Sequence, residues 1–207
     1  MNDFTVPMAL VDYVPVLFFG ASALLLMRDL YNKMVKGAYA LFAAGVINIF
    51  CAGFLKATWK LLYAAGICDF TVLNSMFLPL QSIGFALAGL GILLSLTSKN
   101  KNAVYAVAPP VFSGSFVFII LMVAGLGCLC TGLSIFAAKM KRIPAVILFV
   151  LAFLFSMGMG AMSRQDSSSA AVNWIEQCIN TVSQACLLGG VLILHRAGLA
   201  ELKLKEL

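Results

Sequence analysis

One stretch near the C-terminus carries polar side chains at a spacing that could bind a small molecule. Within the otherwise apolar run 170–194, amide and carboxyl side chains recur at steps of three, one, three and four residues: Asn173, Glu176, Gln177, Asn180 and Gln184. Such steps place side chains along one face of an α-helix. Because amides both donate and accept hydrogen bonds, this face could line a binding site for a neutral polar solute such as a sugar, an amide or a nucleoside.

A second amide pair occurs in the run 71–97. Asn74 and Gln81 are seven positions apart, close to two helical turns, and therefore share a face. If the polar faces of the runs 71–97 and 170–194 point toward each other, their amides would line a pathway for a solute. The alternative is that the amides join helices to one another, each such hydrogen bond contributing about 0.6 kcal/mol in a membrane. The residue pattern leaves both interpretations open.

Two acidic residues fall inside apolar runs, where a charged side chain is costly and marks a candidate functional position. Glu176 lies seven positions past Ser169, which is about 10 Å along a helix. That depth suits either a half-buried proton acceptor, which would couple solute movement to protons, or a side chain that reaches the headgroups. Asp12 lies only four positions past Met8, and we therefore expect it to be exposed at the membrane interface.

Two basic residues, Lys56 and Lys60, are four positions apart and flank Trp59. Long basic side chains extend from apolar segments toward water, and aromatic rings favour the headgroup level. The pattern therefore predicts an interfacial turn. A solute-binding or counter-ion role for Lys56 is the alternative.

The other reactive residue types are too scattered to form a known catalytic or metal-binding motif. His195 is the only histidine, and one residue rather than two separates Cys128 from Cys130, unlike a redox motif. The sequence also has no phosphate loop and no Ser-His-Asp pattern. We therefore predict no catalytic residue, no metal and no cofactor.

The candidate residues belong to a very apolar chain. Of its 207 residues, 62% are hydrophobic and 11% are charged, and the mean hydropathy is +1.03. Soluble domains have about 25% charged residues because water has to wet their surface. The composition therefore predicts an integral membrane protein. It excludes a disordered chain and a secreted disulfide scaffold, and also a nucleic-acid module, since the 14 Lys and Arg residues are spread over short hinges.

Six apolar runs are close to the length that spans a bilayer, about 20 residues. Only helices and closed barrels cross lipid, and the runs lack the alternation of barrel strands, so we expect an all-α polytopic bundle. The runs are 8–27, 37–55, 71–97, 103–138, 143–163 and 170–194.

The fourth run, 36 residues long, raises the question of a seventh span. With six spans, Lys and Arg divide 8 to 6 between the two sides, whereas a reversal near 113–115 divides them 11 to 3. Because Lys and Arg accumulate on the cytoplasmic side, charge favours seven spans and a cytoplasmic C-terminus, most simply in a plasma or inner membrane. Length favours six, since a first span of roughly fifteen residues reaches only about 22 Å. We favour seven, with a thin or tilted fourth helix.

Sparse internal similarity divides the chain into halves. Four residues recur 105 positions later and three recur 99 positions later: Gly20, Ala40, Phe50 and Gly53, then Asn74, Gly91 and Leu93. We predict a three-helix repeat at 1–98, a linker or short fourth helix at 99–115, and a second three-helix repeat at 116–207. The charged cytoplasmic tail is predicted to extend the last helix. Seven spans make the halves parallel and six make them inverted, and both arrangements occur in transporters with the site between the halves.

The layout of three, one and three helices resembles that of the SWEET sugar transporters. Trp59, Tyr63 and Gly66, followed by Asn74, are similar to the tryptophan, tyrosine and glycine that end the second helix of that family and to the asparagine of its third. The Pro-Gln motif of the wider family is missing, and the second half has no matching Trp-Tyr-Gly. The resemblance concerns the layout and implies a pathway between two parallel halves.

Three function classes follow. A transporter or channel for a small polar solute explains the polar faces, the repeat and the absence of room for a soluble domain in the short hinges, and it is the class we favour. The alternatives are a sensory or accessory subunit of a larger complex and a lipid-modifying enzyme, which would need more catalytic groups than the chain offers. The expected partners are the lipid bilayer and the solute, with no nucleic acid, and self-association into a homo-oligomer remains open.

Overall fold

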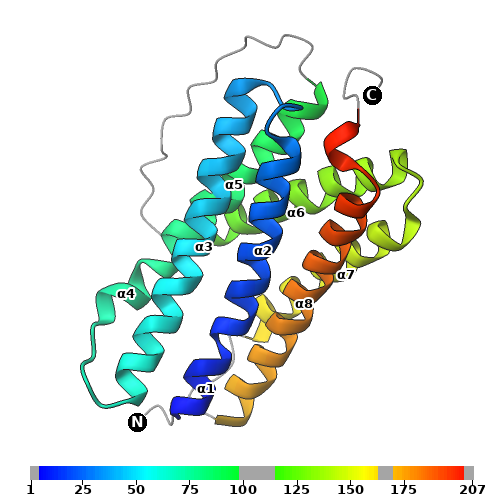
Figure 1. Cartoon of the computed structure of the whole chain (residues 1–207). Helices are drawn as coiled ribbons and strands as arrows, with labels where there is room; N and C mark the ends of the chain where they lie inside the picture. The colour runs from blue at the N-terminus through cyan, green and yellow to red at the C-terminus, as the bar shows by residue number, and fades with distance from the viewer. Residues whose placement is uncertain (1–4, 98–114, 163–169, 203–207) are drawn as a thin grey trace.

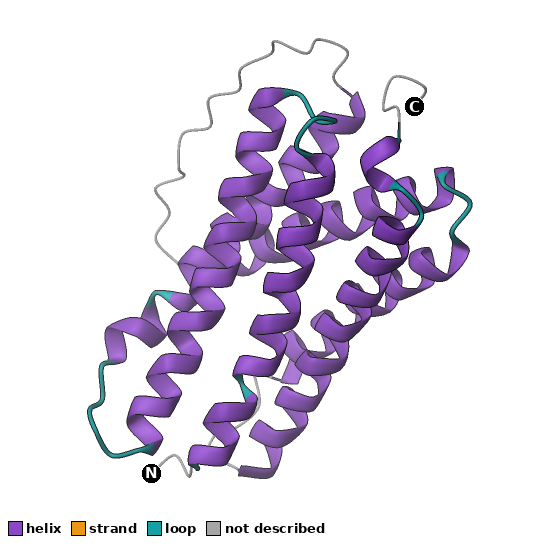
Figure 2. Ribbon diagram, viewed as in Figure 1, coloured by secondary structure: helices purple, strands orange, loops and turns teal. Residues whose placement is uncertain are grey.

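The computed structural model describes residues 5–97, 115–162 and 170–202, and these fold entirely into helices and short connections (Figure 2). Hydrophobic helices dominate because a backbone in an apolar environment must satisfy its own hydrogen bonds. In chain order the elements are α1 (Val6–Val11), α2 (Tyr13–Leu30), α3 (Lys36–Ala64), α4 (Thr71–Ser75), α5 (Phe77–Thr97), α6 (Ser115–Lys139), α7 (Ile143–Met162), α8 (Ala170–Arg196) and the 3-10 turn η1 (Leu199–Glu201).

The predicted apolar runs correspond to these helices, and the all-helical prediction is confirmed for the described residues. Five helices or joined helix pairs are long and apolar enough to cross a membrane: Val6–Leu30, Lys36–Ala64, Thr71–Thr97, Phe116–Lys139 and Ala171–Arg196. A shorter apolar helix lies within α7. The proposed reversal near 113–115 and most of the fourth span lie outside the described residues.

Two predicted runs contain a break, and a proline accounts for each. Pro15 has no backbone N–H to donate to the carbonyl of Val11, and α1 ends at that residue. In the same way Pro79 cannot donate to Ser75, where α4 ends. The first break places Asp12 at the junction of α1 and α2.

The prediction of a helical tail is wrong at its start. The α8 helix ends at Arg196, and Gly198 adopts a φ of 84°, a left-handed conformation that ends a helix at little cost for glycine. The chain then forms η1, whose Leu199 is buried against the bundle.

The outer surface of the bundle is apolar, as expected for contact with lipid. Only 28 to 39% of the best apolar window in each candidate span is buried inside the protein. On the first span Leu10, Leu17 and Leu24, at intervals of seven, all point outward and are more than half exposed. An apolar surface of this extent is not found on soluble monomers, so the helices fit an integral membrane protein.

The helices form a closed ring in the order α2, α3, α5, α6, α7, α8 and back to α2, and Figure 1 shows α2 beside α8. The α3 and α5 helices are antiparallel, since Gly45 packs on Ala88 and Gly91 on Phe42. By contrast, α5 and α6 are parallel, because residues 85 and 92 meet residues 125 and 132 respectively. The termini of α5 and α6 that adjoin the undescribed segment, Thr97 and Ser115, therefore lie at opposite ends of the bundle.

Glycines allow the closest helix contacts in this ring. A Cβ on Gly45 would lie 2.6 Å from the carbonyl oxygen of Gly84, and one on Gly125 would meet the backbone of Phe85. Small residues at helix crossings let backbones approach in membranes, where burial of apolar surface gives no drive for association. These contacts hold α3, α5 and α6 together around the core residues Phe42 and Phe136.

Candidate functional site

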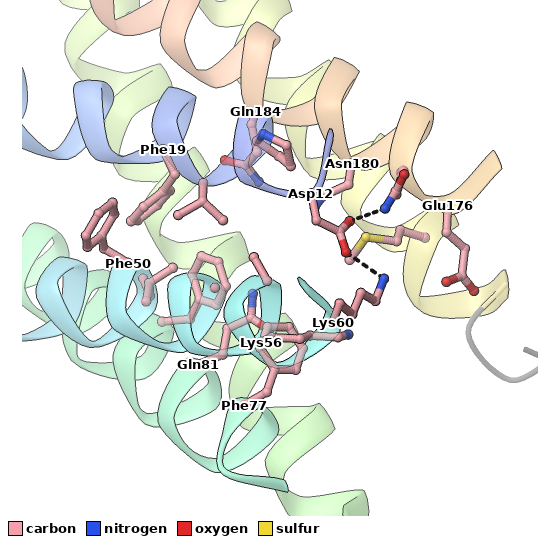
Figure 3. Close-up of a pocket in the computed structure, with 18 residues that line it drawn as sticks. Asp12, Phe19, Phe50, Lys56, Lys60, Phe77, Gln81, Glu176, Asn180 and Gln184 are labelled. Carbon is pink, nitrogen blue, oxygen red and sulfur yellow. Dashed lines mark hydrogen bonds and ion pairs between the residues drawn. The ribbon is translucent and has the colours of Figure 1, made fainter. Parts of the chain in front are cut away.

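A half-open cavity of about 110 Å³ lies between α2, α3, α5, α7 and α8, toward the end at which α3 ends and α8 begins (Figure 3). Phe19 and Phe50 lie at one end of the cavity, whereas Asp12, Lys60 and Glu176 lie at the other (Figure 3). The polar lining residues are Asp12, Lys56, Lys60, Gln81, Glu176, Gln177, Asn180 and Gln184. Because charged and amide side chains from the α1–α2 junction, α3, α5 and α8 converge here, this cavity is the candidate site.

The centre of the site is an ion pair between α3 and the α1–α2 junction. The Nζ atom of Lys60 lies 2.7 Å from Oδ2 of Asp12, and the two side chains are only 11% and 14% exposed. Gln177 of α8 donates from Nε2 to Oδ1 of the same carboxylate and, at 2.9 Å, to the carbonyl oxygen of Met8. Asp12 therefore joins three segments of the chain through charge-assisted hydrogen bonds.

A second pair of opposite charges lines the cavity without forming an ion pair. The Nζ atom of Lys56 lies 4.0 Å from the centre of the Phe77 ring, and within the described part of the chain no carboxylate is within salt-bridge distance of it. Glu176, on α8, forms no ion pair with any described residue either, and its Oε1 atom is buried with no hydrogen-bond partner among those residues. Figure 3 shows Lys56 and Lys60 on one wall of the cavity and Glu176 on the facing wall.

Local helix geometry produces both walls. Lys56 and Lys60 are one turn apart on α3, which continues through both residues to Ala64, so both side chains face the cavity. On α8, Glu176, Asn180 and Gln184 succeed one another at steps of four and form the opposite wall. The indole N–H of Trp59 donates to Asp69 at 2.9 Å, which anchors the turn that follows α3.

Seven of the nine candidate residues predicted from the sequence line this one cavity. The other two do not. Asn74 is exposed on the short helix α4, and Asn173 is 6% exposed near the start of α8, with neither among the lining residues. The residues that converge are Asp12, Lys56, Gln81, Glu176, Gln177, Asn180 and Gln184.

One environment predicted from the sequence is wrong. Asp12 is not exposed, because it lies on the helix face that carries the buried residues Met8, Pro15 and Phe19, and it meets Lys60 and Gln177 there. The interfacial level of Lys56 and Lys60 stays a prediction, and α3 continues past both residues to Ala64. Sequence reasoning also missed Lys60 as a site residue, although its spacing of four from Lys56 was the available signal.

A second polar cluster lies at the opposite end of the α2–α8 contact. The carboxylate of Asp29, 1% exposed, accepts a hydrogen bond from Nδ1 of His195 at 2.7 Å. Arg28 contacts Nε2 of the same ring at 2.8 Å. A neutral imidazole that donates from Nδ1 and accepts at Nε2 satisfies both contacts. The cluster joins α2 to α8 and was missed because the two residues are far apart in sequence.

The two ends of the α2–α8 contact therefore differ. At one end Asp12 and Gln177 border a half-open cavity, and at the other Asp29 and His195 are directly bonded. Across the described residues no group of three or more His, Cys, Asp or Glu side chains could hold a metal ion. The polar cavity therefore lies at one end of the α2–α8 contact and the Asp29–His195 cluster at the other.

Comparison of the chain with protein-family models, curated proteins and solved structures finds no match.

Proposed function

We propose that the protein is a membrane transporter for a small polar solute, which enters the cavity bordered by Asp12 and Lys60. The observation that carries the proposal is the polar cavity between α2, α3, α5, α7 and α8, together with the Asp29–His195 bond at the far end of the α2–α8 pair, which we take as the closed side. A site that is accessible from one side and closed on the other is the arrangement that alternating access requires.

The helix directions support two parallel three-helix repeats. In the first half α2, α3 and α5 alternate in direction, and in the second half α6, α7 and α8 do the same. The two halves meet at two parallel helix pairs, α5 with α6 and α8 with α2. A two-fold rotation that exchanges the halves would therefore place one of these pairs on the other. The 99-residue shift pairs Phe77 with Glu176 and Gln81 with Asn180, and all four line the cavity. This agrees with a site at the interface of parallel repeats.

The distribution of charge supports a cytoplasmic location for the end that holds the Asp29–His195 cluster. Among the described residues seven basic side chains lie at this end, and only Lys56 and Lys60 lie at the other. The seven are Arg28, Lys33, Lys36, Lys139, Lys141, Arg142 and Arg196. Thr97 and Ser115 lie at opposite ends of the parallel α5–α6 pair, which supports seven spans over six. The C-terminus is then cytoplasmic and the cavity faces outward.

This topology predicts opposite labelling of two cysteines. Cys68, an exposed native residue after α3, should react with an impermeant maleimide added outside intact cells. Lys141→Cys, in a background where Cys68 and the other native cysteines are replaced by serine, should react only after permeabilisation. Labelling of both positions from the same side would contradict the topology.

The transport proposal predicts that an amide in the cavity matters for uptake more than for stability. Asn180 lines the cavity and forms no hydrogen bond among the described residues, so Asn180→Leu removes a solute contact without breaking a helix contact. We expect uptake into proteoliposomes to fall about tenfold, the effect of losing one or two polar contacts. The measurement uses a panel of radiolabelled sugars, amino acids, amides and nucleosides.

Asn74→Leu is the matched control, because it makes the same substitution at an exposed position on α4. It should leave uptake within about twofold of the parent. Equal losses of uptake and thermal stability in Asn180→Leu would make this amide a structural contact. Binding of a solute without uptake would favour the sensory or accessory subunit instead.

Proton coupling through Glu176 stays a prediction and forms part of the proposal. It predicts that a proton gradient changes the initial rate of solute uptake by the unmodified protein, because Glu176 would take up and release a proton during the transport cycle. The rate is measured in proteoliposomes with the membrane potential clamped. Uptake that is unaffected by the gradient at external pH values from about 5 to 8 would show that Glu176 carries no coupling proton.

A further inference from the structure

The charges that line the cavity divide into one bonded pair and one separated pair. Asp12 and Lys60 are already joined at 2.7 Å, and Gln177 also bonds Asp12. Lys56 and Glu176 lie on facing walls, and neither forms a salt bridge in the described structure. The cavity therefore presents one cationic and one anionic group to whatever occupies it.

The wall formed by α8 contains hydrogen-bond acceptors that are not matched by donors. Oε1 of Glu176 and Oε1 of Gln177 are buried acceptors with no donor among the described residues, and Oε1 of Gln184 is a third. The orientation of the Gln177 amide follows from its contacts, because its Nε2 donates to Asp12 and to the carbonyl oxygen of Met8. A buried acceptor without a donor is unfavourable, so this wall is suited to a group that carries several N–H donors.

The opposite wall supplies the complementary chemistry. Lys56 carries three N–H donors, and its only described contact is the face of the Phe77 ring. A cation over an aromatic ring remains able to bind an anion, because the ring leaves the other N–H groups unoccupied. A carboxylate is the simplest group that would complete this wall.

We propose that the solute is a small zwitterion, with a carboxylate bound by Lys56 and a primary ammonium group bound by Glu176. The proposal depends on the proposed function, since it names the solute class of the same cavity. The two Lys and the two acidic side chains of the cavity sum to zero in their usual charge states, and a neutral solute preserves that balance. An anion or a cation alone would add an uncompensated charge to a poorly hydrated site, which is costly.

The size of the cavity agrees with a solute of few heavy atoms. A cavity of about 150 Å³ is large enough to hold benzene, and the volume here is about 110 Å³. Glycine, β-alanine and 4-aminobutyrate carry the two groups at increasing separation and are the probes for this site. Trimethylglycine keeps the charges but has no N–H donors, and the donor requirement of the α8 wall predicts that it binds at least tenfold more weakly.

The test measures binding of these probes to the full-length purified protein by calorimetry, with propionate and propylamine as ligands that carry only one of the two charges. We expect glycine, β-alanine or 4-aminobutyrate to bind at least tenfold more tightly than propionate and propylamine do. Lys56→Gln should weaken binding of the zwitterion about tenfold or more and leave binding of propylamine unchanged. Glu176→Gln should weaken it similarly and leave propionate unchanged, a reciprocal pattern that misfolding cannot produce.

Two exposed residues provide matched controls. Lys36→Gln removes the same charge from the other end of α3, and Glu201→Gln removes an exposed carboxylate from η1. Neither should change binding. Binding of a neutral solute such as a sugar or urea, with no binding of the zwitterions, would overturn this inference and leave the transport proposal intact. Retained zwitterion binding in both Lys56→Gln and Glu176→Gln would overturn the assignment of these two residues, whereas absence of binding and uptake for every probe would overturn both proposals.

Discussion

Asp12→Asn is expected to destabilise the protein by about 3–5 kcal/mol, the usual effect of breaking a largely buried ion pair from one side. Asn keeps the shape of the side chain and can still accept the hydrogen bond from Gln177. It removes the negative charge that lies 2.7 Å from Nζ of Lys60. The lost stability is therefore that of the ion pair between the α1–α2 junction and α3.

The double variant Asp12→Asn with Lys60→Gln separates charge from packing. Removing both charges takes away the attraction together with the cost of burying each ion, so much of the lost stability should return. The free energy of unfolding is measured by denaturant titration in a single detergent for the parent, both single variants and the double variant. Additive losses from the two single substitutions would show that the pair contributes nothing as a pair.

Arg28→Gln is the control, because it removes a charge that contributes little to the free energy of unfolding. Its side chain is 65% exposed, and ion pairs at the surface contribute about 0–1 kcal/mol. A loss in Asp12→Asn no larger than that in Arg28→Gln would contradict the central place given to Asp12.

The helices were predictable because apolar runs of bilayer length have few alternatives. The run 170–194 and the helix Ala170–Arg196 begin at the same residue, and 143–163 differs from α7 by one residue at its end. Helical spacing also predicted that Glu176, Asn180 and Gln184 share a face, because that relation depends only on the local geometry of one helix.

Relations between helices were harder to predict, because they depend on packing that no local pattern encodes. Asp12 appeared interfacial when its distance from the start of the run was counted, but it lies on the same helix face as Met8, Pro15 and Phe19, which are buried. That spacing was present in the sequence and would have corrected the prediction. The contact of Asp29 with His195 had no such signal, since 166 positions separate them.

Asp29→Asn is expected to open the closed end of the α2–α8 contact. Asp29 accepts a hydrogen bond from His195 at 2.7 Å, and its side chain is 1% exposed. Asn can still accept this bond but carries no charge, and hydrogen bonds to charged groups contribute about 1.5–3 kcal/mol against about 1 kcal/mol for neutral ones, so the weakened contact should raise the population of any state open at this end by about tenfold or more. In the proposed cycle, that is the state that releases solute to the cytoplasm.

The opening is measured at Gln184, which lines the cavity on α8. Gln184→Cys is placed in a protein whose native cysteines are replaced by serine, and a small impermeant thiosulfonate is added to inside-out vesicles. In the parent background the thiol should react slowly from this side, because the Asp29–His195 contact closes the path. With Asp29→Asn added, the labelling rate should rise about tenfold or more.

Arg28→Gln again supplies the matched control, since it alters the exposed member of the same cluster and leaves the Asp29–His195 bond in place. Its labelling rate should remain within about twofold of the parent. His195→Phe removes the other partner of the bond and should reproduce the effect of Asp29→Asn. If Asp29→Asn and His195→Phe both label as slowly as the parent, this contact does not close the pathway, and the closure must then reside in the apolar packing deeper in the bundle, where Phe19 and Phe85 meet edge to face.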